Sequence, residues 1–114
     1  MNKKTSDIIK IASSTNINFG DDVLVFNYIN NNGEQWEGCL EEWIGNDSNT
    51  EHLNDFEYNG IKYHCLGTSG GGSDLILVSN NDSPKIYYYN DYDLTISKIA
   101  DNIPEFINKL STPI

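Results

Sequence analysis

Asp74-Leu75-Ile76-Leu77-Val78-Ser79 is the stretch of this sequence that decides the fold. A short, nearly continuous apolar run of this kind is typical of a strand that is buried on both faces. It follows a glycine-rich turn, expected from Gly67 onward, and it precedes the polar turn cluster at 80–84. The stretch therefore predicts a central strand at 74–79.

Three further strands are expected around this central one. Apolar and polar residues alternate in 61–66 and 94–99, and the run Tyr87-Tyr88-Tyr89 marks a strand near 84–89. Short polar turns join these segments, which favours an antiparallel meander. At least one of the three tyrosine rings is expected in the core, and Tyr88 is the candidate for the surface.

Two helices are expected, one near each end of the sequence. A cap at Thr5 or Ser6, followed by apolar residues at helical spacing, predicts a short helix at about 6–14. Near the other end, Asn102 and Glu105 have the spacing of a capping box and predict a helix at about 102–110. Its buried face is expected to include Phe106 and Leu110.

The segment between the first helix and residue 61 is harder to assign. Residues 21–32 fit a strand by their β-branched and aromatic content, but they also have an acidic start and an Asn-Gly end that suit a helix. Residues 40–44 predict a short acidic helical turn, and 45–59 predict a long loop. The whole pattern predicts one α+β domain over 1–114, an antiparallel sheet of about four to five strands with helices packed on one face.

The charge of the chain is strongly uneven. The net charge is −10, yet the ten acids between Ile11 and Ile61 are accompanied by no lysine or arginine. Nucleic-acid binding is disfavoured, because neutralising phosphates needs clustered cations. Two alternatives remain open for the acidic half: a surface for a basic protein partner, or a surface that only promotes solubility.

No apolar run is long enough for a membrane span, and no apolar segment of signal-peptide length follows Lys3 and Lys4. We therefore expect a cytoplasmic protein in which Cys39 and Cys65 are reduced thiols.

The sequence offers little for catalysis. Gly70-Gly71-Gly72 lacks the lysine of a phosphate-binding loop, and the nearby Asp74 would repel phosphate. His52, His64, Cys39 and Cys65 do not have the spacing of a structural zinc site. A pair of carboxylates could serve in hydrolysis or bind a hard cation, but such pairs are unavoidable in so acidic a segment and therefore indicate no site. We therefore expect no enzyme, no metal and no cofactor.

Trp36 and Trp43 lie within the acidic segment. Both tryptophans can belong to the core, or one or both can be exposed anchors ringed by carboxylates, since tryptophan is enriched at binding hot spots.

The run from Gly67 to Val78, the strands after it and the capped helix at about 102–110 together resemble the SUKH superfamily. Residues 6–33 resemble it more loosely, through Ile17–Asp22 and the run from Phe26 to Gly33. The resemblance implies a helix over 21–32. Its bacterial members mostly neutralise polymorphic toxins, and its eukaryotic relatives include the yeast cell-wall synthesis regulators.

The resemblance, taken with the acidic segment, implies an immunity protein whose acidic surface binds a toxin with a basic active-site cleft. A regulatory or scaffolding domain without a toxin partner is the alternative. The expected partner-binding residues are Glu34, Trp36, Glu37, Glu41, Glu42, Trp43, Asp47, Gly71, Gly72 and Asp74.

Overall fold

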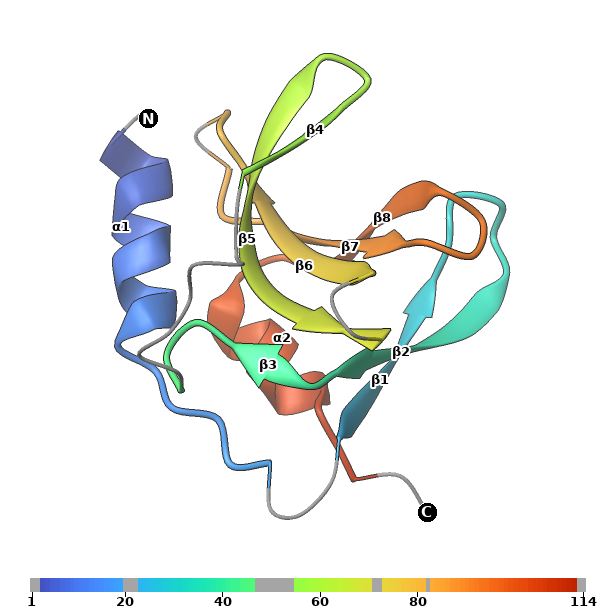
Figure 1. The fold of residues 1–114 in the computed structure, drawn as a ribbon, viewed down its shortest axis with the longest axis horizontal. Helices are drawn as coiled ribbons and strands as arrows, with labels where there is room; N and C mark the ends of the chain where they lie inside the picture. Colours follow the sequence, from blue (N-terminus) through green and yellow to red (C-terminus); the bar gives the residue numbers. More distant parts are fainter. Residues whose placement is uncertain (1–2, 20–22, 47–54, 71–72, 82, 113–114) are drawn as a thin grey trace.

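The computed structural model describes residues 3–19, 23–46, 55–70, 73–81 and 83–112 of the chain (Figure 1). It is an α+β fold with two helices, a six-stranded antiparallel sheet and a separate two-stranded sheet. The elements in chain order are α1 Lys3–Ser13, β1 Leu24–Ile29, β2 Gln35–Leu40, β3 Glu42–Trp43, β4 Phe56–Tyr58, β5 Ile61–Ser69, β6 Asp74–Ser79, β7 Ile86–Asn90, β8 Thr95–Ala100 and α2 Ile103–Lys109.

The large sheet has the order β3-β5-β6-β7-β8, with β4 also paired to β5. The nine-residue β5 is long because it has two partners on one side: β4 pairs with its first residues and β3 with Gly67 and Thr68. A bulge between Cys65 and Gly67 separates these two halves. A bulge adds local twist, and the strand curves strongly in Figure 1. The predicted glycine-rich turn is therefore wrong at Gly67–Ser69, which are strand.

The four predicted C-terminal strands are confirmed. β6 begins and ends where the apolar run does, and β7 and β8 lie within one or two residues of the expected bounds. Both predicted helices are also present, but α1 already includes Thr5 and Ser6, so the cap predicted at these residues is wrong. Asn102 caps α2 by accepting a hydrogen bond from the backbone N–H of Glu105, at 2.9 Å. Phe106 is fully buried as expected, whereas Leu110 is only half-buried.

The helix expected over 21–32 is wrong, because residues 24–29 form strand β1. Phe26 and Tyr28 face the core while Asn27 and Ile29 are exposed, which is the period-two burial of a strand. The Asn30 side chain fixes the hairpin turn, since its Oδ1 accepts hydrogen bonds from the N–H groups of Asn32 and Glu34. The strand alternative was therefore the correct one.

The helical turn expected at 40–44 is also wrong. β2 ends at Leu40, and β3 then joins the large sheet, with the Glu41 N–H donating to the Thr68 carbonyl at 2.8 Å. The long loop expected at 45–59 is wrong at Phe56–Tyr58, which form β4. Residues 47–54 lie outside the described residues.

The main core lies on the face of the large sheet that both helices and the β1–β2 hairpin cover (Figure 1). The Phe26 ring is at its centre, 5.1 Å from the Tyr88 ring centroid and 5.5 Å from that of Phe106. Trp43 is fully buried beside Phe106, at 5.9 Å. Tyr88 belongs to this core, so its suggested surface position is wrong.

A second, smaller cluster covers the opposite face of the large sheet. Tyr63, Cys65, Leu77 and Ile96 are buried there, under partly exposed side chains from β4, β6 and β7. The rings of Phe56 and Tyr89 meet at 4.8 Å across this face, so β4 closes over the sheet.

Strand β8 is one edge of the large sheet, and two side chains cover its outward carbonyls. Asn31 Nδ2 donates to the Ile96 carbonyl at 2.7 Å, and Lys109 Nζ donates to the Ile99 carbonyl at 2.6 Å. Neither described helix has the length and apolar character needed to cross a membrane.

Candidate protein-interaction surface

The β1–β2 hairpin and the β7–β8 turn lie side by side at one end of the molecule (Figure 1). The Trp36 and Tyr92 rings are in contact, with centroids 6.1 Å apart. Below them, the buried Asn90 side chain donates to the Tyr28 hydroxyl at 3.2 Å. These contacts tie strand β2 to a turn that is more than fifty residues away in the sequence.

Carboxylates from both halves of the chain gather along this end. Glu41 accepts a hydrogen bond from the Gly70 N–H at 2.5 Å, close to where Asp74 begins β6. Asp74 Oδ1 in turn accepts from the Asp91 N–H at 3.0 Å, in the β7–β8 turn. We define the acidic edge as Glu34, Glu37, Glu41, Asp74, Asp91 and Asp93.

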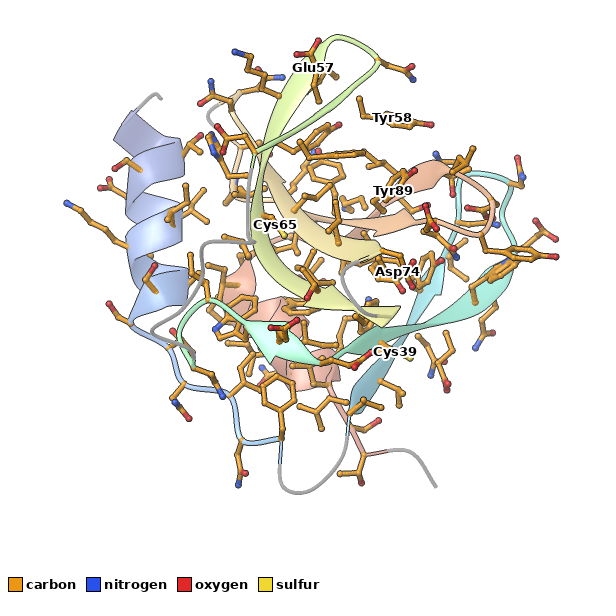
Figure 2. The ribbon with its side chains drawn as sticks, in the orientation of Figure 1. Cys39, Glu57, Tyr58, Cys65, Asp74 and Tyr89 are labelled. Carbon is orange, nitrogen blue, oxygen red and sulfur yellow. The ribbon has the colours of Figure 1, made fainter. Side chains whose placement is uncertain are left out.

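The ionisable groups beside the acidic edge respond to its charge. Burial raises the pKa of the Cys39 thiol, and the Glu37, Asp74 and Glu41 carboxylates raise it further. Figure 2 shows Cys39 and Asp74 close together on this side of the molecule. Burial also raises the pKa of the Tyr28 hydroxyl. The hydrogen bond with Asn90 lowers this pKa in part, and the Asp93 and Asp74 carboxylates raise it slightly. Every charged group that shifts the pKa of Cys39 or Tyr28 is a carboxylate.

The three described lysines that follow β6 lie near Asp101 instead. Lys98 pairs with Asp101 at 2.6 Å, and the charges of Lys98, Lys85 and Lys109 all lower the pKa of that carboxyl. The acidic edge is therefore a region of negative potential, which attracts cations and repels phosphates.

The β7–β8 turn is held by hydrogen bonds from several directions. Asn90 Oδ1 accepts from the Tyr92 N–H at 2.8 Å, and Asp93 Oδ1 accepts from the Thr95 N–H at 3.2 Å. The Tyr58 hydroxyl donates to the Leu94 carbonyl at 2.8 Å. Leu94 has φ +58°, a conformation that non-glycine residues rarely adopt. The turn is therefore well defined.

This ordered turn exposes two large apolar side chains. Tyr92 is 85% exposed and Leu94 is 58% exposed. Single exposed apolar residues are common, but two of them on a fixed turn beside carboxylates provide a candidate contact point.

The structure separates the predicted partner-binding residues into two groups. Glu34, Glu37 and Glu41 are exposed, and Trp36 is half-buried at the margin of the core. Glu42 is half-buried and accepts a hydrogen bond from the Thr68 hydroxyl at 3.0 Å. Glu42 therefore has a structural contact as well as partial exposure.

Trp43 is not an exposed anchor, and that prediction is wrong. Its side chain is 0% exposed, and its indole N–H donates to the Thr15 carbonyl at 2.9 Å. Asp74 is half-buried and accepts from the Tyr88 hydroxyl at 2.7 Å, so it also helps to hold the fold. Asp47, Gly71 and Gly72 lie outside the described residues.

Three residues of this surface were not predicted from the sequence: Asp91, Tyr92 and Asp93. The sequence pattern indicates only a polar turn between two strands at these positions. A tyrosine inside an otherwise polar turn is the one local signal that marks them.

The two cysteines and His64 do not converge, and His52 lies outside the described residues. Cys39 and Cys65 are free, and burial raises the pKa of the Cys65 thiol to about 12. His64 Nδ1 contacts Asp55 Oδ1 at 2.7 Å, on the strand face opposite Cys65. Within the described ranges, no three His, Cys, Asp or Glu residues are grouped as metal ligands. The Gly70 N–H is hydrogen-bonded to Glu41 rather than turned toward a ligand.

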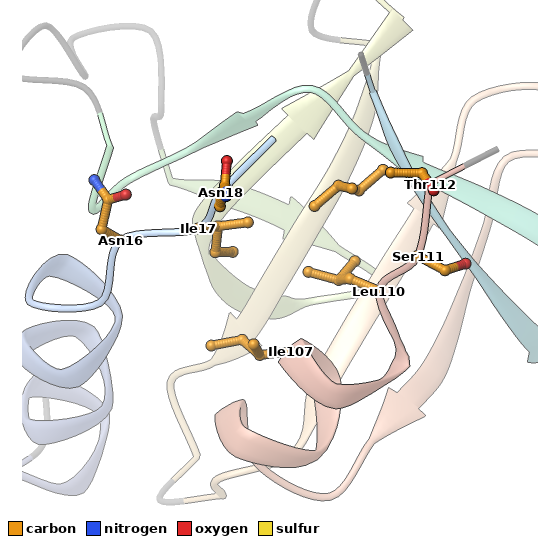
Figure 3. Close-up of a pocket in the computed structure, with 8 residues that line it drawn as sticks. Asn16, Ile17, Asn18, Ile107, Leu110, Ser111 and Thr112 are labelled. Atoms are coloured by element: carbon orange, nitrogen blue, oxygen red, sulfur yellow. The ribbon is translucent and has the colours of Figure 1, made fainter. Parts of the chain in front are cut away.

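A pocket of about 300 Å³ lies away from the acidic edge, between the chain after α1 and the end of α2 (Figure 3). Its described lining is Asn16, Ile17, Asn18, Leu24, Ile107, Leu110, Ser111 and Thr112. None of these side chains is charged or strongly nucleophilic, so the lining suggests no reaction.

Comparisons of the chain with protein-family models, curated proteins and solved structures found no match.

Proposed function

We propose that this protein binds a basic protein through the acidic edge, and that it acts as an immunity protein which neutralises a toxin by covering its active site. The observation that carries the proposal is the meeting of carboxylates from both halves of the chain. Glu41 is bound to the Gly70 N–H near the start of β6, and Asp74 is bound to the Asp91 N–H in the turn that also contacts Trp36 through Tyr92. The resemblance to SUKH proteins motivates the choice of a toxin as the partner.

Electrostatics supports a protein partner rather than a nucleic acid. Phosphates would be repelled by the acidic edge, whereas a basic cleft that normally binds nucleic acid would be attracted to it. Such attraction accelerates encounter and weakens as salt screens exposed charges over a Debye length of about 10 Å at 0.1 M.

The test first captures the partner from a lysate of the source organism, and then uses that partner with two triple variants of the protein. The edge variant is Glu34→Gln, Glu37→Gln and Asp91→Asn. The control variant is Asp7→Asn, Glu57→Gln and Glu105→Gln, three acids that are exposed and lie outside the acidic edge. Both variants lose the same amount of charge.

We expect the edge variant to lower the association rate about tenfold at low salt and to flatten its salt dependence, with little change in the control. Growth of cells that express the toxin should be restored by the wild type and less by the edge variant. Equal association rates for the two variants would contradict the proposal that the acidic edge is the binding surface. Binding without growth rescue would favour the alternative, a regulatory or scaffolding domain.

A further inference from the structure

Tyr92 is an exposed ring whose position is fixed. It is 85% exposed, yet its backbone N–H is bound by the Asn90 side chain and its ring contacts that of Trp36. The Asn90 side chain also reaches the Tyr28 hydroxyl in the core. The exposed ring is thus connected to the core through one buried residue.

Trp36 provides the second ring of the pair. It pairs with Tyr28 across the hairpin and packs against the edge of the main core, while remaining partly exposed. The two rings are inclined at 42°, so they are in contact without being stacked face to face. Tyr92 therefore presents most of its ring to solvent, and Trp36 presents the part that is not packed against the core or against Tyr92.

Carboxylates neighbour both aromatic residues along the chain. Glu34 and Glu37 lie on either side of Trp36 in the chain, and Asp91 and Asp93 lie on either side of Tyr92. Tryptophan and tyrosine rings attract cations through their electron-rich faces, and nearby carboxylates strengthen that preference. Rings without such charges would accept an uncharged apolar group equally well.

We propose that Trp36 and Tyr92 form the seat for an arginine side chain of the basic partner. Arginine fits better than lysine because its planar guanidinium stacks on aromatic rings while its edge N–H groups donate to carboxylates. The fixed geometry of the turn lowers the ordering cost of binding. This inference rests on the proposed function and specifies the partner chemistry that the acidic edge recognises.

The test uses capped hexa-arginine and hexalysine peptides as probes, followed through the two indole N–H signals in the NMR spectrum. Trp36 is the reporter. Trp43 is the internal control, because it is fully buried and its N–H is bound to the Thr15 carbonyl. We expect hexa-arginine to shift the Trp36 signal and to leave the Trp43 signal in place.

The variants separate the rings from the charges. Tyr92→Leu should weaken hexa-arginine binding about three- to fivefold, as expected for an exposed cation–π contact. Tyr92→Phe keeps the ring and should bind like the wild type. Hexalysine should bind more weakly than hexa-arginine and lose less in Tyr92→Leu. Because Tyr92 is so exposed, all of these variants should fold, which circular dichroism will verify.

Each outcome has one meaning. If Tyr92→Leu binds hexa-arginine as well as the wild type does, while the triple edge variant binds it more weakly, the arginine seat is refuted and the acidic edge stands. A Trp36 signal that stays in place when the peptide binds also refutes the seat. If neither peptide binds at low salt, both the seat and the acidic edge as a binding surface are refuted.

Discussion

Replacing Trp43 by alanine tests the assignment of this ring to the core. The side chain is 0% exposed, it contacts the Phe106 ring at 5.9 Å, and its N–H satisfies the Thr15 carbonyl. Truncating a buried tryptophan typically costs about 3–5 kcal/mol, and leaving the carbonyl unpaired adds about 1 kcal/mol. We therefore expect a loss of about 4–6 kcal/mol in the free energy of unfolding.

Urea unfolding followed by far-ultraviolet circular dichroism measures this loss. With a slope of about 2 kcal/mol per molar, the midpoint should fall by about 2–3 M. Trp43→Phe keeps a ring but not the donor, so a loss of about 1–2 kcal/mol is expected. Trp36→Ala is the matched control and should cost about 1 kcal/mol, because its ring is only half-buried. A cost below about 1 kcal/mol for Trp43→Ala would refute the core assignment.

Three further predictions concern the core, the cysteines and the C-terminal helix. Phe106→Ala should cost about 3–5 kcal/mol in urea unfolding and Leu110→Ala clearly less, since only Phe106 is fully buried; equal costs would contradict this. Cys65 should resist alkylation in the native protein and react after unfolding. Because its pKa rises from 9.0 to about 12 on folding, the folded state favours the protonated thiol, and stability is lost as the pH rises from 9 towards 12. The difference in the free energy of unfolding between the wild type and Cys65→Ala should therefore shrink by about 1 kcal/mol between pH 8 and pH 10. A difference that stays constant over this pH range would contradict the raised pKa of Cys65. Asn102→Ala should lower thermal stability by about 1 kcal/mol, and Asn102→Asp should retain the cap.

The C-terminal half of the fold was predictable because its local signals agree with its tertiary contacts. The run 74–79 is apolar and becomes buried, and the Asn102–Glu105 spacing forms the cap that it predicts. The β4–β5 hairpin also has a local signal, in Asn59-Gly60. Both residues have positive φ, 51° and 78°, as the favoured two-residue hairpin turn requires.

Strand β1 was not predictable in the same way. Residues 23–29 are apolar almost throughout, so periodicity does not separate strand from helix. The choice depends on the pairing with β2 and on the core contacts of Phe26, which are distant in sequence. Burial of Trp43 has the same origin, because it follows from the pairing of β3 with β5.

The candidate surface was predictable in part. The acids of β2 stand out in the sequence because no cation accompanies them. Asp74 was expected there, but the contribution of Asp91 and Asp93 was not foreseeable, since it depends on the contact between Asp74 and the β7–β8 turn. The charge count of the sequence therefore indicated that the surface is negatively charged, but not which residues belong to it.

The two side chains that cover β8 have a consequence for self-association. An exposed edge strand is a template on which another chain can add its own strand and begin aggregation. Here the carbonyls of Ile96 and Ile99 are occupied by Asn31 and Lys109, so an incoming strand would have to displace both side chains. Removing them together should unmask the edge with little loss of core packing. The hairpin turn and the last helix therefore close the β8 edge of the sheet to further strands.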